Sequence, residues 1–382
     1  MKILIISDSP NITTGYGVIA YGFGKYLSRA GFEVAFGALQ QMGMPTKIEI
    51  DGKLFDIYSC YGGQTQYIEK TVEEARPDIA IHIRDPVVLT PALFIPSYRL
   101  KPTLARHGVK VIHWAPVMGE PPQEVVLSLI EDSDLLLAPT EWAYNLYLYH
   151  GFPSSRMEIL RWGVDTEVYK PLQLSRNDRA LFNLSTDRFV VMAAGVHDRI
   201  HKAYPILMKA VSMLAKKYDV ELYLHTGVGA FKLDHYVDML GLRGRVVIPA
   251  IYIKDWGIPF EEMVKLYNLV DVVCSPSALE GANMILCEAL ACGRPIVASE
   301  LPVHVEMTMN SGLYAPIIAE MPDITCFMQV TTAEKIAEQL EKVIDGWRPK
   351  PEFIEDYRRW ISWETRVKEF IEILENHPEI SG

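Results

Sequence analysis

Short apolar runs alternate with amphipathic stretches along most of the chain, and within each run the apolar residues are nearly continuous. Residues 2–7 predict a strand, 18–30 a helix and 32–37 the next strand. Strands separated by helices and apolar on both faces are typical of parallel sheets covered on both sides, so we expect an α/β fold. Further strands are expected at 78–83, 110–113, 135–138, 158–161, 189–194, 220–225, 245–249, 271–275 and 295–299.

The chain has 382 residues, more than one hydrophobic core usually supports, so two domains are expected. The best boundary is near Lys170-Pro171, which precedes a polar stretch at 175–179. Each half, 1–170 and 171–356, then contains its own Rossmann-like, doubly wound parallel sheet. Ligands of such sheets bind beyond the carboxyl ends of the strands, and a site is expected where the two domains face each other across a cleft.

Composition narrows the range of functions. The chain carries 37 basic and 48 acidic residues, a net charge of −11, which argues against nucleic acid as a main partner. No stretch approaches the roughly 18 apolar residues of a membrane span, and the first apolar run is too short for a signal peptide. The five cysteines form no zinc or CxxC spacing, which suits reduced thiols in a cytoplasmic protein. Net charge leaves peripheral contact with a membrane open.

The segment 275–295 holds the most informative carboxylates. A strand is expected to end at 275, a loop carries Glu280-Gly281, and a helix begins near Asn283. The amides of its first turn, at Asn283, Met284 and Ile285, suit an anion such as a diphosphate. Glu280 can then face a sugar on that diphosphate, and Glu288 can accept hydrogen bonds from a ribose diol. Either glutamate alone is more simply an ordinary surface or ion-paired residue, but the pair in this setting favours a site.

Positive charge follows the first strand of the second half. Arg199 and Lys202 lie after Gly195 and before a helix, where both could reach a diphosphate leaving group. Fixed cations stabilise such charge when no metal does so. The alternative is a solvated basic turn, which the dipole at a helix amino terminus disfavours.

Other polar residues follow strands of the first half. Gly15 and Gly17 would let backbone approach a ligand closely, but the third glycine of a dinucleotide fingerprint is missing, so a dehydrogenase is poorly supported. His113 could bind a sugar hydroxyl or be a satisfied core histidine, and both interpretations stay open. His82, Arg84 and Asp85 could line an acceptor pocket. The triplet 132–134 resembles an acidic metal motif but precedes a strand, so a turn is favoured and no metal site is assigned.

Together these segments resemble family 4 of the glycosyltransferases. Two glutamates with seven residues between them, Glu280 and Glu288, match its hallmark. The segment 162–171, which contains Gly163-Val164-Asp165, is similar to its inter-domain segment. The segment 134–141 is similar to the strand entering the last helix of the first domain, and Ser362-Trp363-Glu364 to its terminal helix. The resemblance implies the GT-B fold, with a helix in 357–382 packing back on the first domain.

The resemblance also implies an activity. The enzyme would transfer a hexose, with retention and without metal or cofactor, from a nucleotide-diphosphate sugar to a glycan, lipid or protein. Glu280 would contact the donor sugar, Glu288 the ribose, and Arg199 with Lys202 the diphosphate. The Gly15–Gly17 loop would approach donor or acceptor, and His113 the transferred sugar. Two departures, Ala203 and Ala282-Asn283, replace the family's usual glycine and Phe-Gly, so the donor is not inferred from better-known members.

Other functions remain compatible with the same sequence. A nucleotide-sugar epimerase would use a similar donor site, whereas a phosphorylase would need a pyridoxal lysine that we do not find. A module that binds a nucleotide sugar without turnover belongs to a different class. Fold alone does not separate these alternatives.

Overall fold

The chain divides into two compact units. A computed structural model describes residues 1–381 except 90–96, 197–199, 228, 250–257 and 324–325. The first unit contains Met1–Gly163 and Ile361–Gly382, and the second contains Val164–Asp323 and Phe327–Trp360. The change of unit after Gly163 falls seven residues before the expected 170/171 boundary. Tyr169 explains this difference, because its ring lies 6.1 Å from that of Tyr267 in the second unit.

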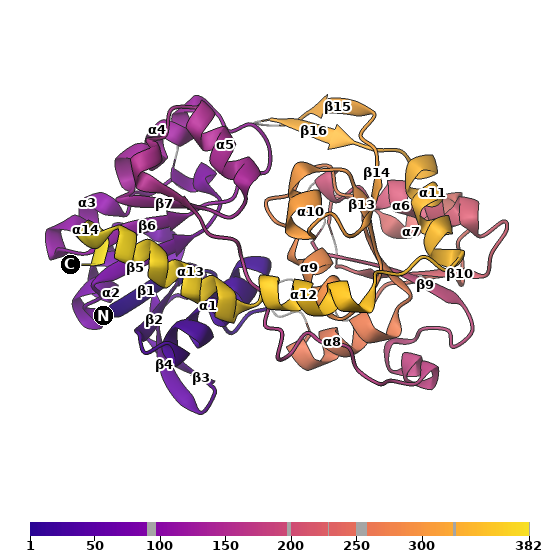
Figure 1. Cartoon of the computed structure of the whole chain (residues 1–382), viewed down its shortest axis with the longest axis horizontal. Coiled ribbons are helices and arrows are strands. Elements are labelled where there is room, and N and C mark those ends of the chain that lie inside the picture. Colours follow the sequence, from indigo (N-terminus) through magenta and orange to yellow (C-terminus); the bar gives the residue numbers. More distant parts are fainter. Residues whose placement is uncertain (90–96, 197–199, 228, 250–257, 324–325, 382) are drawn as a thin grey trace. The chain divides into compact units, whose positions relative to one another are not determined.

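The first unit is built on a mostly parallel sheet (Figure 1). Within the described residues its strand order is β3-β4-β2-β1-β5-β6-β7-β8, and only β3 and β4 pair antiparallel. The chain runs outward from β1 through β2 and then returns to β5 on the other side of β1. The strands are β1 (Lys2–Ser7), β2 (Glu33–Ala38), β3 (Thr46–Ile50), β4 (Lys53–Ser59), β5 (Ile79–Ile83), β6 (Lys110–Trp114), β7 (Leu135–Ala138) and β8 (Met157–Ile159).

Helices cover this sheet, and the tail contributes to its packing. Helix α13 packs on α1, where Trp363 lies against two glycines. A Cβ at Gly22 would meet the Trp363 ring at 2.1 Å, and one at Gly163 would meet it at 2.6 Å, so neither position has room for a side chain. The helices are α1 (Gly15–Arg29), α2 (Thr65–Ala75), α3 (Lys101–Leu104), α4 (Gln123–Asp132), α5 (Glu141–Tyr149), α13 (Trp363–Asn376) and α14 (Pro378–Ser381).

The second unit contains a parallel sheet of its own. The order within the described residues is β11-β10-β9-β12-β13-β14. Successive strands are therefore added on one side of β9 and then, from β12 onward, on its other side. We call this position, between β9 and β12, the reversal point of the sheet. A small antiparallel pair, β15 and β16, lies outside it. The strands are β9 (Phe189–Ala194), β10 (Val220–His225), β11 (Val246–Val247), β12 (Val272–Ser275), β13 (Ile296–Ser299), β14 (Leu313–Ala315), β15 (Ala319–Pro322) and β16 (Phe327–Val330).

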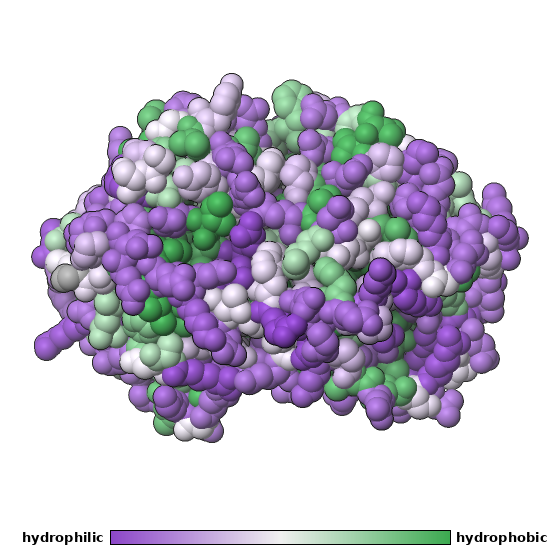
Figure 2. Space-filling model, in the orientation of Figure 1, coloured by the Kyte–Doolittle hydropathy of each residue, from purple (hydrophilic) through white to green (hydrophobic). Residues whose placement is uncertain are grey.

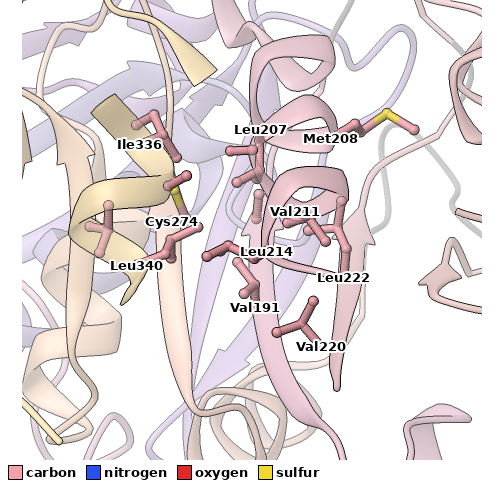
Figure 3. Packing of buried hydrophobic residues seen from close by; sticks show 14 of the residues in the cluster. Val191, Leu207, Met208, Val211, Leu214, Val220, Leu222, Cys274, Ile336 and Leu340 are labelled. Atoms are coloured by element: carbon pink, nitrogen blue, oxygen red, sulfur yellow. The ribbon is translucent and has the colours of Figure 1, made fainter. Parts of the chain in front are cut away.

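The core of the second unit lies between its sheet and two helices (Figure 3). Leu207 and Val211 of α6 and Ile336 and Leu340 of α11 are fully buried against the strands. The helices are α6 (Tyr204–Leu214), α7 (Leu233–Met239), α8 (Phe260–Leu269), α9 (Met284–Ala291), α10 (Pro302–Met307), α11 (Ala333–Ile344) and α12 (Pro351–Ile361). The α/β class expected from the sequence, with a parallel sheet in each domain, is confirmed.

Figure 2 shows one face of the molecule, on which hydrophilic residues dominate and separate hydrophobic patches lie between them. Across the described part of the chain, none of the helices combines the length and apolar character needed to cross a bilayer.

Candidate active site

The two glutamates follow β12, at the reversal point of the second sheet. Strand β12 ends at Ser275, Glu280-Gly281 lie in the loop, and α9 begins at Met284. This is the edge at which ligands of doubly wound sheets bind. The amides of Met284 and Ile285 fall in the first turn of α9, where a helix offers donors without internal partners. Their binding to a diphosphate stays a prediction.

Glu280 is ion-paired with Lys202. The carboxylate Oε1 and the ammonium Nζ are 2.5 Å apart, and both side chains are largely buried. Burial alone would raise the pKa of Glu280. The positive charge and the hydrogen bond of Lys202, together with smaller effects of neighbouring histidines, outweigh burial, so the pKa lies below its ordinary value. The strand β9 leads to this pair through Gly195, whose φ of +124° and close contact with the Lys202 side chain leave little space for a Cβ. Glu280 and Lys202 are therefore both ionised, and their opposite charges cancel locally.

The side chain of Asn283 is held by hydrogen bonds to Ser275 and to a neutral histidine, His304. Asn283 Nδ2 lies 2.7 Å from Ser275 Oγ and 2.7 Å from His304 Nε2, while His304 Nδ1 lies 2.8 Å from the Ser299 carbonyl oxygen. A carbonyl can only accept, so Nδ1 carries the ring proton and Nε2 accepts from Asn283. Burial lowers the pKa of His304 to about 4, which keeps the ring neutral at pH 7. Asn283 itself has a φ of +54°, a conformation that asparagine tolerates better than most residues.

Glu288 lies in the second turn of α9 and is 7% exposed. The Tyr267 hydroxyl donates to its Oε2 at 2.8 Å, and Tyr169 also hydrogen-bonds to it. Burial raises the pKa of Glu288 to about 7, although both hydroxyls act in the opposite direction. The carboxyl group is therefore poised to change charge near neutral pH.

Three of these neighbours were missed by the sequence reasoning. Tyr169 lies within the stretch that resembles the family's inter-domain segment, so a signal for it existed. Tyr267 on α8 and His304 on α10 look like ordinary helical residues, and only the folded chain brings them to the glutamates.

The other expected site residues have mixed outcomes. Arg199 lies outside the described residues, so its phosphate-binding role stays a prediction. Gly17 is required by packing, because a Cβ there would lie 2.3 Å from the Ile12 carbonyl oxygen; Gly15 has no neighbouring atom within 4 Å of such a Cβ. Of the two glycines, Gly15 is the one that leaves open space for a ligand.

His113 is buried and hydrogen-bonded on both sides of its ring. Its Nε2 lies 3.0 Å from Asp132 Oδ2 and its Nδ1 3.0 Å from His82 Nδ1, while His82 Nε2 lies 2.7 Å from the Tyr98 hydroxyl. The geometry thus favours the core-histidine interpretation, and contact with a sugar stays untested. Asp132 also accepts the amides of Leu100 and Lys101, as a structural turn residue does. No cluster of three or more His, Cys, Asp or Glu suited to a metal occurs among the described residues.

Two Rossmann-like units in one chain are the components of the GT-B fold. Residues 188–345, less than half of the chain, match the family model of group 1 glycosyl transferases. Both findings support the resemblance to family 4 glycosyltransferases that the motifs carry.

Particular relatives support the assignment. D-inositol 3-phosphate glycosyltransferase of Mycolicibacterium smegmatis is 31% identical over 203 residues, covering 51% of this chain and 45% of the relative. This chain therefore spans less than half the length of that relative. Sucrose-phosphate synthase of Thermosynechococcus elongatus has a similar fold, with a TM-score of 0.76, 14% identity and 98% of both chains covered. Anabaena Alr3699/HepE, solved with UDP and glucose, has a TM-score of 0.71 at 15% identity, over 98% and 100% of the two chains.

Proposed function

We propose that this protein transfers a hexose from a nucleotide-diphosphate sugar to an acceptor, with retention of anomeric configuration. The proposal rests on two placements at the reversal point of the second sheet: Glu280, paired with Lys202, lies in the loop before α9, and Glu288 lies in the second turn of that helix. The fold comparisons, on which the donor class depends, include HepE with UDP-glucose and an E. coli protein bound with UDP-2-fluoro glucose. UDP-glucose is therefore the first donor to test.

Each residue has a part in donor binding. Glu288 accepts hydrogen bonds from the ribose diol, and the amides of Met284 and Ile285 bind the diphosphate. Lys202 has three donors, so it can contact a phosphate oxygen while it stays paired with Glu280. Glu280 then faces the sugar hydroxyls.

The reaction needs little covalent chemistry from the protein. When the bond between the anomeric carbon and the phosphate oxygen breaks, the leaving phosphate carries the new negative charge, and Lys202 and the helix amides stabilise it. The same phosphate accepts the proton of the acceptor hydroxyl as the new bond forms on the same face. Orientation and charge stabilisation supply the catalysis, and no protein base is assigned. No cofactor takes part in this scheme.

Substitutions in the donor site test the proposal. Removing one group that stabilises transition-state charge commonly lowers kcat by about 10²–10³-fold, so Lys202→Ala and Glu280→Gln should each have losses of this order. Lys209→Ala is a matched control, because Lys209 pairs with Glu334 on the exposed side of α6. Unchanged turnover in both site variants would contradict the assignment.

Product analysis separates the alternatives. A retaining transferase forms a glycoside with the donor's anomeric configuration, which NMR of the product resolves. An epimerase would instead convert the sugar without an acceptor, and a binding module would hold the nucleotide without turnover. Cytoplasmic location and peripheral membrane contact remain predictions of the sequence.

A further inference from the structure

A second polar cluster lies at the reversal point of the first sheet. Strand β1 pairs with β2 on one side and β5 on the other, so the crevice expected for a ligand lies beyond the ends of β1 and β5. Asp8 follows β1, and Arg84 follows β5. Ser7 Oγ donates to the Ile83 carbonyl oxygen at 3.0 Å and ties the two strand ends together.

Asp8 organises this cluster. Its Oδ1 accepts from Gln40 Nε2 and from Arg84, and its Oδ2 accepts from the Thr14 hydroxyl at 2.7 Å. Thr14 in turn caps α1 by accepting from the Gly17 amide at 3.1 Å. The ends of three neighbouring strands and one helix are therefore bound to a single buried carboxylate.

Arg84 remains accessible although it is paired. Its side chain is 29% exposed, against 7% for Asp8, and its guanidinium lies 5.5 Å from the centre of the Tyr16 ring. A guanidinium has five N–H donors, so most stay available after the bond to Asp8. Ser9 is 5% exposed, and its hydroxyl has no hydrogen-bond partner among the described residues. Such an unsatisfied buried group indicates a missing partner.

The net charge of the cluster disfavours an anionic ligand. Asp8, Arg84 and the adjacent Asp85 sum to −1, so a phosphate or carboxylate would meet two like charges and only one opposite charge. A hydroxyl group both donates and accepts, and can use guanidinium donors and carboxylate acceptors together.

We propose that the Asp8–Arg84 cluster binds the acceptor, and that the part of the acceptor held here is an uncharged polyhydroxylated group. This inference rests on the proposed function and specifies its second substrate. A free polyol and the uncharged terminal sugar of a glycan share this chemistry, and both enter the test.

Ligand binding can be tested without turnover. Saturation-transfer NMR on the wild-type chain would compare glucose, myo-inositol and maltotriose with glucose 6-phosphate and inositol 3-phosphate. We expect transfer to at least one uncharged ligand and weaker or no transfer to its phosphorylated counterpart. A preference for the phosphorylated ligands, or no transfer to any uncharged one, would overturn the proposal. Maltotriose against glucose and inositol distinguishes a glycan end from a free polyol.

A charge variant supplies the sharper test. Asp8→Asn leaves the Arg84 charge unbalanced, so the ratio of phosphorylated to uncharged ligand binding should rise at least tenfold. Asp51→Asn is the matched control, because Asp51 is a half-exposed carboxylate paired with Arg29 at 2.7 Å in the same unit. If Asp8→Asn does not fold, Arg84→Gln replaces it and should weaken every uncharged ligand at least fivefold. An unchanged ratio in folded Asp8→Asn, or unchanged affinity in Arg84→Gln, contradicts the proposal.

Failure of the proposed function gives a different pattern. A chain that binds no nucleotide sugar and has no donor turnover refutes the transferase proposal, whereas the NMR comparison still reports on the Asp8–Arg84 cluster. Conversely, normal donor binding with a phosphorylated preferred acceptor refutes only the inference about the acceptor.

Discussion

Glu288 is expected to make donor binding depend on pH. Burial holds the pKa of its carboxyl at about 7, and the ribose diol is expected to bind the ionised form. About 10% of the free protein would be ionised at pH 6 and about 90% at pH 8, so the donor Kd should be roughly tenfold weaker at pH 6. Burial also raises the pKa values of Tyr169, Tyr267 and Cys292, so these three neighbours stay neutral over the pH range in which Glu288 titrates.

The same shift affects the stability of the free protein. A carboxyl whose pKa in the folded protein lies above its ordinary 4.5 favours the protonated form. Its contribution to the free energy of unfolding is therefore fully present below about pH 4.5 and is lost as the pH rises through 7. Above pH 7 the buried charge costs about 3 kcal/mol, on the scale of 1.36 kcal/mol per pKa unit. Glu288→Gln removes this cost, so it should stabilise the free protein by up to ~3 kcal/mol at pH 8, have little effect at pH 4.5, and weaken donor binding.

Two measurements check this reasoning. Calorimetric titration with an intact nucleotide sugar at pH 6 and 8 reports the Kd; free nucleoside diphosphate is unsuitable, because its terminal phosphate titrates with a pKa near 6. Denaturant unfolding of wild type, Glu288→Gln and the exposed control Glu262→Gln reports stability. Equal donor affinity at the two pH values, or a Glu288→Gln variant less stable than wild type at pH 8, would refute the role given to burial.

Three further substitutions give independent checks. Ala203→Gly should raise the free energy of unfolding by about 1 kcal/mol, because Ala203 has a φ of +48°; a loss of stability in denaturant unfolding would count against this. Gly22→Ala should lower it by about 1–3 kcal/mol, since the added Cβ overlaps Trp363; an unchanged midpoint would show that the helix pair adjusts freely. Tyr267→Phe removes a hydrogen bond that lowers the pKa of Glu288, so the pH dependence of donor affinity should move to higher pH, and a shift to lower pH would contradict it.

The repeating pattern of strands and helices was sufficient to predict the α/β class, because continuous apolar strands are a local property. Strands β3 and β4 were not among the strands expected from the sequence, and Thr46, Lys47 and Glu49 make β3 an exposed, polar edge strand. The turn between the two strands did carry a signal: Asp51-Gly52 has positive φ at both residues, as two-residue hairpin turns prefer.

The candidate site was predictable only as far as its residues share a motif. Glu280 and Glu288 lie eight positions apart on one loop and the helix that follows it, so their spacing in the sequence was enough to single them out as candidates. Tyr267, His304 and Asp8 act through contacts between segments distant in sequence, and no local pattern distinguishes them from other core residues. His113 was undecided for the same reason, because its two alternatives depend on which groups the fold brings to its ring.

A crystal structure of the protein with saturating UDP-glucose would test most directly whether the second unit binds a nucleotide sugar at the reversal point of its sheet. We expect the ribose hydroxyls within hydrogen-bond distance of Glu288, the diphosphate at the first turn of α9, and the glucose beside Glu280. Nucleotide bound elsewhere, or a ribose that does not contact Glu288, would contradict this expectation.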